Sequence, residues 1–136
     1  MFTGCKSQPN EEVYISDFYN IHEEYKDAWG NVGKYDISLP YIHCDSKSAK
    51  KLNQTIKNEY KDLVDSLDEA KEEGYTLPYT KVSYDVYTHS NLLSLVIKEE
   101  VETEYPRYKV YHFDSKTKKR VSNKNYIRNI KSVKKI

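Results

Sequence analysis

One long stretch of the sequence places an apolar residue at every third or fourth position. The repeating residues are Ala49, Leu52, Ile56, Tyr60, Leu63, Leu67 and Ala70. This spacing forms one face of a helix with 3.6 residues per turn, while Lys, Glu, Asp and Asn fill the other face. Ser46 or Ser48 can cap its start, and Gly74 can end it. We therefore expect a helix over residues 48–73 that spans a sheet, with one face buried and the other in water.

The segments before this helix predict strands. Residues 34–42 alternate apolar and polar side chains, as a half-buried strand does. Pro40 cannot donate a backbone hydrogen bond, which favours a sheet edge or a bulge at that point. A shorter strand is expected over residues 12–16, whereas residues 17–27 show no clean period and receive no assignment.

The segment after the helix, residues 80–104, predicts a hairpin. A two-residue loop at Ser90-Asn91 sets Val86 opposite Leu95 and Tyr84 opposite Ile97. Both apolar sets then lie on one side of the sheet, and a slip of one residue would turn one set to solvent. A third strand follows over residues 107–113. Its buried face is open at this point, and the alternatives are Tyr108 with Val110 or Tyr111 with Phe113.

These elements predict an α+β fold, an antiparallel meander of four or five strands with the 48–73 helix on one face. We expect a tether over residues 1–10, one domain over residues 11–121 and a short basic helix over residues 122–136. A turn over residues 114–119 joins the last two parts. The terminal helix carries a stripe of Tyr126, Ile127 and Ile130, and we expect Ile127 and Ile130 to dock on the domain's open edge.

The charge balance bounds the possible partners. The 136 residues carry a formal net charge of only +1, so general binding to nucleic-acid phosphates is not favoured. Residues 116–135 nevertheless hold nine Lys or Arg and no acid. This run is either a solvated basic face or an arm that docks on an anionic surface.

The two cysteines suggest different roles. Cys5 follows Phe2, Thr3 and Gly4, which is similar to the end of a bacterial lipobox and predicts lipidation of Cys5. The charged and apolar regions of a secretory signal do not precede it, so either the start has been trimmed or the match is due to chance. Cys44 is expected to be a part-buried structural residue without a disulfide partner.

No motif for catalysis, metal or cofactor binding occurs. The four histidines are dispersed, and only four glycines are available to build a phosphate-binding loop. We therefore predict no catalytic residue, no metal and no cofactor. The positive signal is the 14 tyrosines, several of which must lie on the surface. Tyr87, Tyr108 and Tyr111 are the candidate partner-binding residues; the alternative is that tyrosines suit strands and frame the core.

The pattern from Tyr35 to Ser122 resembles a bacterial extracytoplasmic domain of unknown function, the PdaC/RsiV-like group. The resemblance rests on four segments: Tyr35 to Ile42, Ala49 to Ile56, Leu92 to Leu95, and Phe113 to Lys119 followed by Val121-Ser122. Such domains form the non-catalytic N-terminal part of peptidoglycan deacetylases and the ectodomain of lysozyme-sensing anti-sigma factors. Lys118 or Lys119 departs from the glycine usual at that turn. No deacetylase domain is present in this sequence.

The resemblance and the residues together favour a non-enzymatic binding or sensing domain of a Gram-positive bacterium. We expect an extracellular lipoprotein, held to the membrane only through its lipid, that engages a secreted protein such as lysozyme or a peptidoglycan fragment. The alternative is a small cell-wall hydrolase or an accessory domain of a deacetylase. A hydrolase needs a cleft that joins His112 or His43 to a carboxylate.

Overall fold

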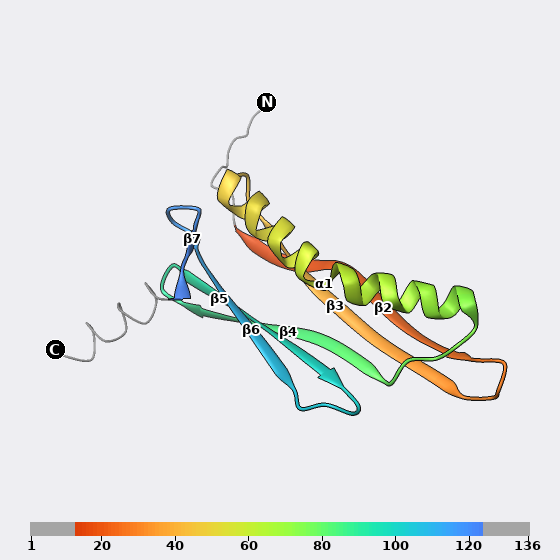
Figure 1. Cartoon of the computed structure of the whole chain (residues 1–136). Coiled ribbons are helices and arrows are strands. Elements are labelled where there is room, and N and C mark those ends of the chain that lie inside the picture. The colour runs from red at the N-terminus through yellow and green to blue at the C-terminus, as the bar shows by residue number, and fades with distance from the viewer. Residues whose placement is uncertain (1–12, 124–136) are drawn as a thin grey trace.

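The protein forms one sheet with one long helix against it, in the computed structural model that describes residues 13–123 (Figure 1). In chain order the elements are β2 (Tyr14–Lys26), β3 (Val32–His43), α1 (Lys47–Glu73), β4 (Thr80–His89), β5 (Leu92–Val101), β6 (Arg107–Asp114) and β7 (Lys119–Val121). The strands lie in the sheet in that same order, from β2 to β7. The predicted α+β class is confirmed, with six strands in place of four or five.

Helix α1 begins and ends at the residues that the sequence suggested. The Ser46 hydroxyl accepts a hydrogen bond from the Ala49 backbone N–H at 3.0 Å, and this cap satisfies a donor that the first turn leaves free. Gly74 adopts φ 83° and donates its N–H to the Ala70 carbonyl at 2.9 Å. The predicted stripe is the buried face, with Leu63 partly buried and the others fully so.

The meander is interrupted at one strand pair. Strands β3 and β4 run parallel, because α1 carries the chain back across the sheet before β4 begins. Their pairing covers only residues 35–37 and 80–82. The expectation of a wholly antiparallel meander was therefore wrong at this pair, although the other four pairs of neighbouring strands are antiparallel.

Beyond the end of the β3–β4 pairing, a side chain of α1 forms hydrogen bonds with the backbone of β3. The Asn53 amide accepts from the Ile42 N–H at 2.8 Å and donates to the Ile42 carbonyl at 3.0 Å. These are the two bonds that a neighbouring strand would have made. Ile42 is only 1% exposed, and the Asn53 amide therefore satisfies backbone groups that would otherwise be costly to bury.

Strand β2 is much longer than the expected 12–16 segment and includes most of residues 17–27. Its register with β3 shifts between Asp17 and Tyr19, so that Phe18 has no paired residue. This irregularity interrupts the alternation that identifies a strand in a sequence. Pro40 lies opposite Asp17 at the shift, as the expectation of a bulge at that proline required.

The predicted hairpin register is confirmed. Val86 pairs with Leu95 and Tyr84 with Ile97, across the two-residue turn at Ser90-Asn91. In β6 the structure selects the second of the two alternatives. Tyr111 and Phe113 are buried at 7% and 1% exposure on the side of the core cluster.

A short strand, β7, follows the predicted turn. The Asp114 side chain accepts from the N–H groups of Lys116 and Thr117, and the Lys118 N–H donates to the Asp114 carbonyl at 2.8 Å. Lys118 adopts φ 60°, a conformation that glycine favours. The turn is therefore closed despite the lysine. Residues 124–136, which contain most of the expected terminal helix, lie outside the described residues, as does the expected tether.

Candidate partner-binding face

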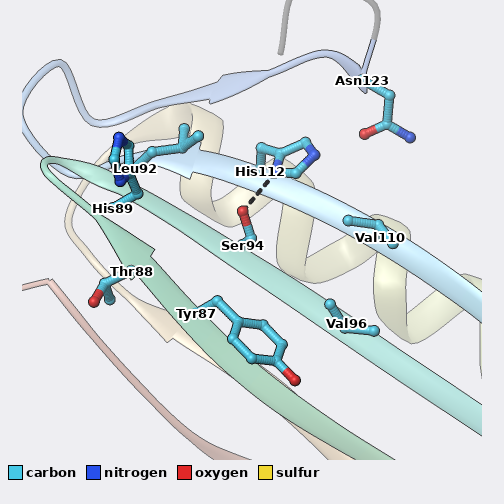
Figure 2. A pocket seen from close by; sticks show the side chains of 9 residues that line it. All are labelled: Tyr87, Thr88, His89, Leu92, Ser94, Val96, Val110, His112 and Asn123. Atoms are coloured by element: carbon cyan, nitrogen blue, oxygen red, sulfur yellow. Dashed lines mark hydrogen bonds between the residues drawn. The ribbon is translucent and has the colours of Figure 1, made fainter. Parts of the chain in front are cut away.

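Strands β4, β5 and β6 present two chemically different faces. Side chains alternate along each strand, so Leu95, Ile97 and Phe113 point into the core with the buried side of α1. Their neighbours point to the opposite side, with α1 behind the sheet in Figure 2. We call that opposite side the open face and define it by Tyr87, Ser94, Val96, Tyr108, Val110 and His112.

The structure separates the three tyrosines predicted to bind a partner. Tyr87 and Tyr108 both belong to the open face and are 59% and 60% exposed. Tyr111 points to the core, and the guanidinium carbon of Arg120 lies 5.2 Å from the centre of its ring. Two of the predicted residues are thus brought to one face, whereas Tyr111 is a core residue that offers a partner little surface.

A cavity of about 430 Å³ lies on the open face (Figure 2). Its lining is mostly apolar and includes Tyr87, His89, Leu92, Val96, Val110 and His112. Val96 and Val110 are directly opposite each other in β5 and β6, and Tyr87 is opposite Ser94. The cavity is therefore a product of strand register, which aligns the apolar side chains of three neighbouring strands.

A serine and a histidine meet in this cavity. Ser94 pairs with His112 across β5 and β6, and its Oγ lies 2.8 Å from His112 Nδ1. His112 is only 4% exposed, and burial lowers its pKa because the charged imidazolium loses hydration. His112 is consequently neutral at neutral pH. Ser94 and His112 add a polar pair to a mostly apolar surface.

The surroundings of this pair bear on whether it could act in hydrolysis. The described residues that line the cavity include no Asp or Glu. Ser94 lies in β5, between β4 and β6, where both neighbouring strands use the backbone hydrogen-bonding groups. An oxyanion needs free, preorganised N–H donors close to the nucleophile. Ser94 Oγ and His112 Nδ1 thus lie at hydrogen-bond distance on a strand whose backbone is paired on both sides.

The other histidines lie at different places. His22 Nδ1 is 2.9 Å from Asp36 Oδ1 on the exposed surface of β2 and β3, and this hydrogen bond is the main cause that lowers the pKa of Asp36. The His43 ring stacks on Tyr14 at 4.3 Å, and its Nε2 lies 2.6 Å from Ser16 Oγ. The described contacts of His43 thus belong to an aromatic and hydroxyl environment, without a carboxylate.

Three further observations bear on the site. No group of three or more His, Cys, Asp or Glu residues within residues 13–123 could hold a metal ion. In the same part of the chain, no helix has the length and apolar character needed to cross a membrane. Cys44 is partly buried, as expected, and its Sγ lies 3.7 Å from the Ser46 hydroxyl oxygen. Cys5, the predicted lipidation residue, lies outside the described residues.

Sequence reasoning missed the Ser94–His112 pair, although a signal for it was present. Extending the hairpin register by one strand, with Leu95 opposite Tyr111, would have placed Ser94 opposite His112. It also missed a surface cluster of Tyr14, Phe18 and Tyr41 near the start of β2, where Phe18 stacks on Tyr41 at 5.6 Å. Phe18 lies at the register shift of β2, where the alternation that identifies a strand in the sequence is interrupted.

Comparisons with known proteins add a structural likeness. No family model matches the chain, and no curated protein matches it. The fold is similar to the crystal structure of a member of the DUF3298 family from Bacteroides fragilis, with a TM-score of 0.39 and 10% sequence identity. The likeness covers 83% of this chain and 60% of that structure, so the chain spans less than two thirds of its length. Similarity at this level carries no inference about function.

Proposed function

We propose that this protein is a non-enzymatic binding domain whose open face docks a secreted protein. The observation that carries the proposal is the mostly apolar cavity of about 430 Å³, with exposed tyrosines on the same face. Large aromatic side chains around an apolar pocket are the usual anchors of a protein interface. Tyr87 and Tyr108 are the expected anchors, and Val96 and Val110 form the floor between them.

The character of this surface favours a protein over a glycan as the partner. A glycan presents hydroxyl groups, which need polar partners at a binding site, whereas this cavity offers mainly the methyl groups of Leu92, Val96 and Val110. An apolar side chain of a protein partner fits such a lining. Lysozyme is the probe that the resemblance to the PdaC/RsiV-like group suggests.

The proposed location is the outer surface of a Gram-positive cell, with a lipid on Cys5 as the anchor. Eight residues, 6–13, separate Cys5 from Tyr14, where β2 begins. A chain of that length reaches at most about 30 Å when it is fully extended. The domain would therefore stay close to the membrane and meet partners that diffuse through the wall. Mass spectrometry of membrane-associated protein tests this by detecting diacylglyceryl on Cys5, and an unmodified Cys5 would contradict it.

Binding of lysozyme to the purified protein tests the function. Calorimetry is expected to give saturable binding that weakens at least tenfold in the Tyr87→Ala, Tyr108→Ala double variant. Tyr105→Ala is the matched control, because Tyr105 is 91% exposed but belongs to the turn between β5 and β6 rather than to the open face. If the double variant bound lysozyme as tightly as the wild type, the two tyrosines of the open face would not be the binding anchors. If lysozyme fails to bind while peptidoglycan fragments bind, the partner is a glycan and the protein proposal is wrong.

The second candidate function is a small cell-wall hydrolase, and one observation favours it. The 2.8 Å distance between Ser94 Oγ and His112 Nδ1 is within the range of a nucleophile and its base. In such an enzyme Ser94 would attack and His112 would take its proton. We rank this function second because the described residues that line the cavity include no Asp or Glu and because the backbone of β5 is paired on both sides. Turnover of an activated ester that disappears in Ser94→Ala would reverse the ranking.

A further inference from the structure

The two halves of α1 carry opposite charge. Residues 45–58 hold four Lys and one Asp, whereas residues 59–73 hold seven Asp or Glu and two Lys. A helix dipole favours acids in the first turn and bases in the last. The first turn of α1 holds lysines and no acid, and the last turn holds Glu72 and Glu73 beside Lys71. The order of charge is therefore the reverse of the one that stabilises a helix.

The lysines of the basic half share the outer face of the helix. Lys50, Lys51 and Lys57 lie three, four and ten residues after Lys47, a spacing that keeps them on one side of a helix. All four are exposed, while the buried residues of α1 lie on the other side, against the sheet. The basic half of α1 thus presents a stripe of lysines that points away from the sheet.

The turn between β6 and β7 adds cations at the same end of the molecule. The Arg120 N–H donates to the Ser48 hydroxyl at 2.7 Å, which holds β7 beside the start of α1 (Figure 1). Lys116 and Lys119 are exposed on this segment. The Asp114 carboxylate accepts backbone hydrogen bonds that close the turn. Two segments that are far apart in the sequence therefore combine their positive charge.

Exposed aromatic side chains lie beside the lysines of α1. Tyr14 and Phe18 are 56% and 47% exposed, and the rings of Phe18 and Tyr41 stack at 5.6 Å. Lys57 Nζ lies 5.6 Å from the centre of the Phe18 ring. Phe18 and Tyr41 also line a cavity of about 280 Å³ together with Lys50 and Lys57. Aromatic rings next to cations are typical of surfaces that bind at the level of lipid headgroups.

The sheet begins at this same end. Tyr14 pairs with His43, and α1 begins four residues after His43, at Lys47. The acidic end of α1 is far away, because a helix of 27 residues is about 40 Å long. A lipid on Cys5 would therefore hold the basic end, rather than the acidic end, next to the membrane.

We propose that this end of the domain docks on an anionic lipid surface. We call the docking region the basic aromatic surface and define it by Tyr14, Phe18, Lys47, Lys50, Lys51 and Lys57. The lysines attract headgroup phosphates, and the two aromatic rings contact the headgroup layer. Because α1 lies behind the sheet as seen from the open face (Figure 2), docking through α1 leaves the open face turned away from the membrane. The inference rests on the proposed location at a membrane.

Vesicle binding tests the proposal on the full chain with Cys5→Ser, which cannot be lipidated. Cosedimentation is expected with mixed phosphatidylglycerol and phosphatidylcholine vesicles, and not with phosphatidylcholine alone. High salt should weaken the binding, because it screens the lysines from the headgroups. The Lys47→Gln, Lys50→Gln, Lys51→Gln variant should bind about tenfold more weakly or less tightly still, since each lysine near an anionic surface adds to the attraction.

The chain offers a matched control for that variant. Lys26→Gln, Lys34→Gln, Lys81→Gln removes the same net charge from three exposed lysines at the end of β2 and the starts of β3 and β4. That region lies at the acidic end of α1 (Figure 1). The control should bind anionic vesicles within about threefold of the unsubstituted lysines, because its charges lie outside the docking region.

Tryptophan fluorescence reads which end meets the lipid. Trp29, the one tryptophan of the chain, is 78% exposed in the turn between β2 and β3, far from the basic aromatic surface. Its emission should not change on anionic vesicles. Phe18→Trp combined with Trp29→Phe moves the indole to the docking region, where the emission should shift to shorter wavelength as the ring leaves water.

Three outcomes would overturn the proposal. Equal weakening of the two triple variants would assign the binding to net charge rather than to this surface. A shift of Trp29 without a shift in the Phe18→Trp variant would place the opposite end on the lipid. Binding to soluble polyglycerol phosphate but not to vesicles would identify a wall polymer as the anionic partner. Each of these results is independent of Cys5, whose lipidation is read separately by mass spectrometry.

Discussion

The two faces of β4, β5 and β6 are built from adjacent residues and differ in burial. On the side of the core, Leu95 is 1% exposed and Ile97 is not exposed at all. On the open face, Tyr87 and Tyr108 expose more than half of their surface. Exposed aromatic side chains also occur elsewhere on the described surface, such as Trp29 and Tyr105, but those two belong to turns and not to a sheet face with a cavity. The difference shows that one face contributes to the core, whereas the other leaves large aromatic side chains in water.

The largest expected effect compares two leucines of β5 on opposite faces. Leu95→Ala should lower the free energy of unfolding by about 2–5 kcal/mol, because it removes buried methyl groups and leaves a cavity. Leu92→Ala makes the same change on the opposite side, where Leu92 is only partly buried, and should cost about 1 kcal/mol or less. Urea unfolding measures both. Equal losses would mean that the two faces do not differ in their contribution to stability.

The next effect concerns the bond between α1 and the free edge of β3. Asn53→Ala should destabilise the fold by about 1–3 kcal/mol, because the Ile42 N–H and carbonyl both lose their partner. Gln54→Ala is the matched control, since Gln54 follows on the same helix and bonds only the exposed Asn58. A loss no larger than that of the control would show that water replaces the amide at no cost.

The free energy of unfolding should also depend on pH through His112, which lies on the open face. Burial lowers the pKa of His112 in the folded protein, so protons bind the unfolded chain more readily. The contribution of His112 to stability is therefore complete above about pH 6.5, the ordinary histidine value, and declines as the pH falls below it. Unfolding free energies at pH 7.5 and 5.5 measure the decline. His112→Gln should reduce this decline, and an equal decline in that variant would contradict the assignment to His112.

The smallest expected effect is on stability when the exposed tyrosines are removed. Tyr87→Ala and Tyr108→Ala should each change the free energy of unfolding by about 0.5 kcal/mol or less, because most of each side chain is already in water. Thermal unfolding checks this. A loss above about 2 kcal/mol would assign these tyrosines to the fold, and their effect on binding could then not be attributed to direct contact.

The helix and the hairpin could be predicted because their signals are local and repeated. The stripe from Ala49 to Ala70 has the helical period, and only one register of β4 and β5 puts their apolar residues on one side. The parallel pairing of β3 with β4 could not be predicted, because it covers three residues and depends on the path of α1. The state of the Tyr60 hydroxyl could not be predicted either. Tyr60 fits the apolar stripe, and only the structure shows that its hydroxyl has no described partner.

The most direct test of the account is a methyl NMR titration with lysozyme, which reads both faces at once. The account predicts shifts or broadening for the methyl groups of Leu92, Val96 and Val110, which line the open face. It predicts no change for Leu95 and Ile97, which alternate with them in β5 and point to the core. Changes confined to the methyl groups of α1, or none at saturating lysozyme, would contradict the assignment of the open face as the partner-binding surface.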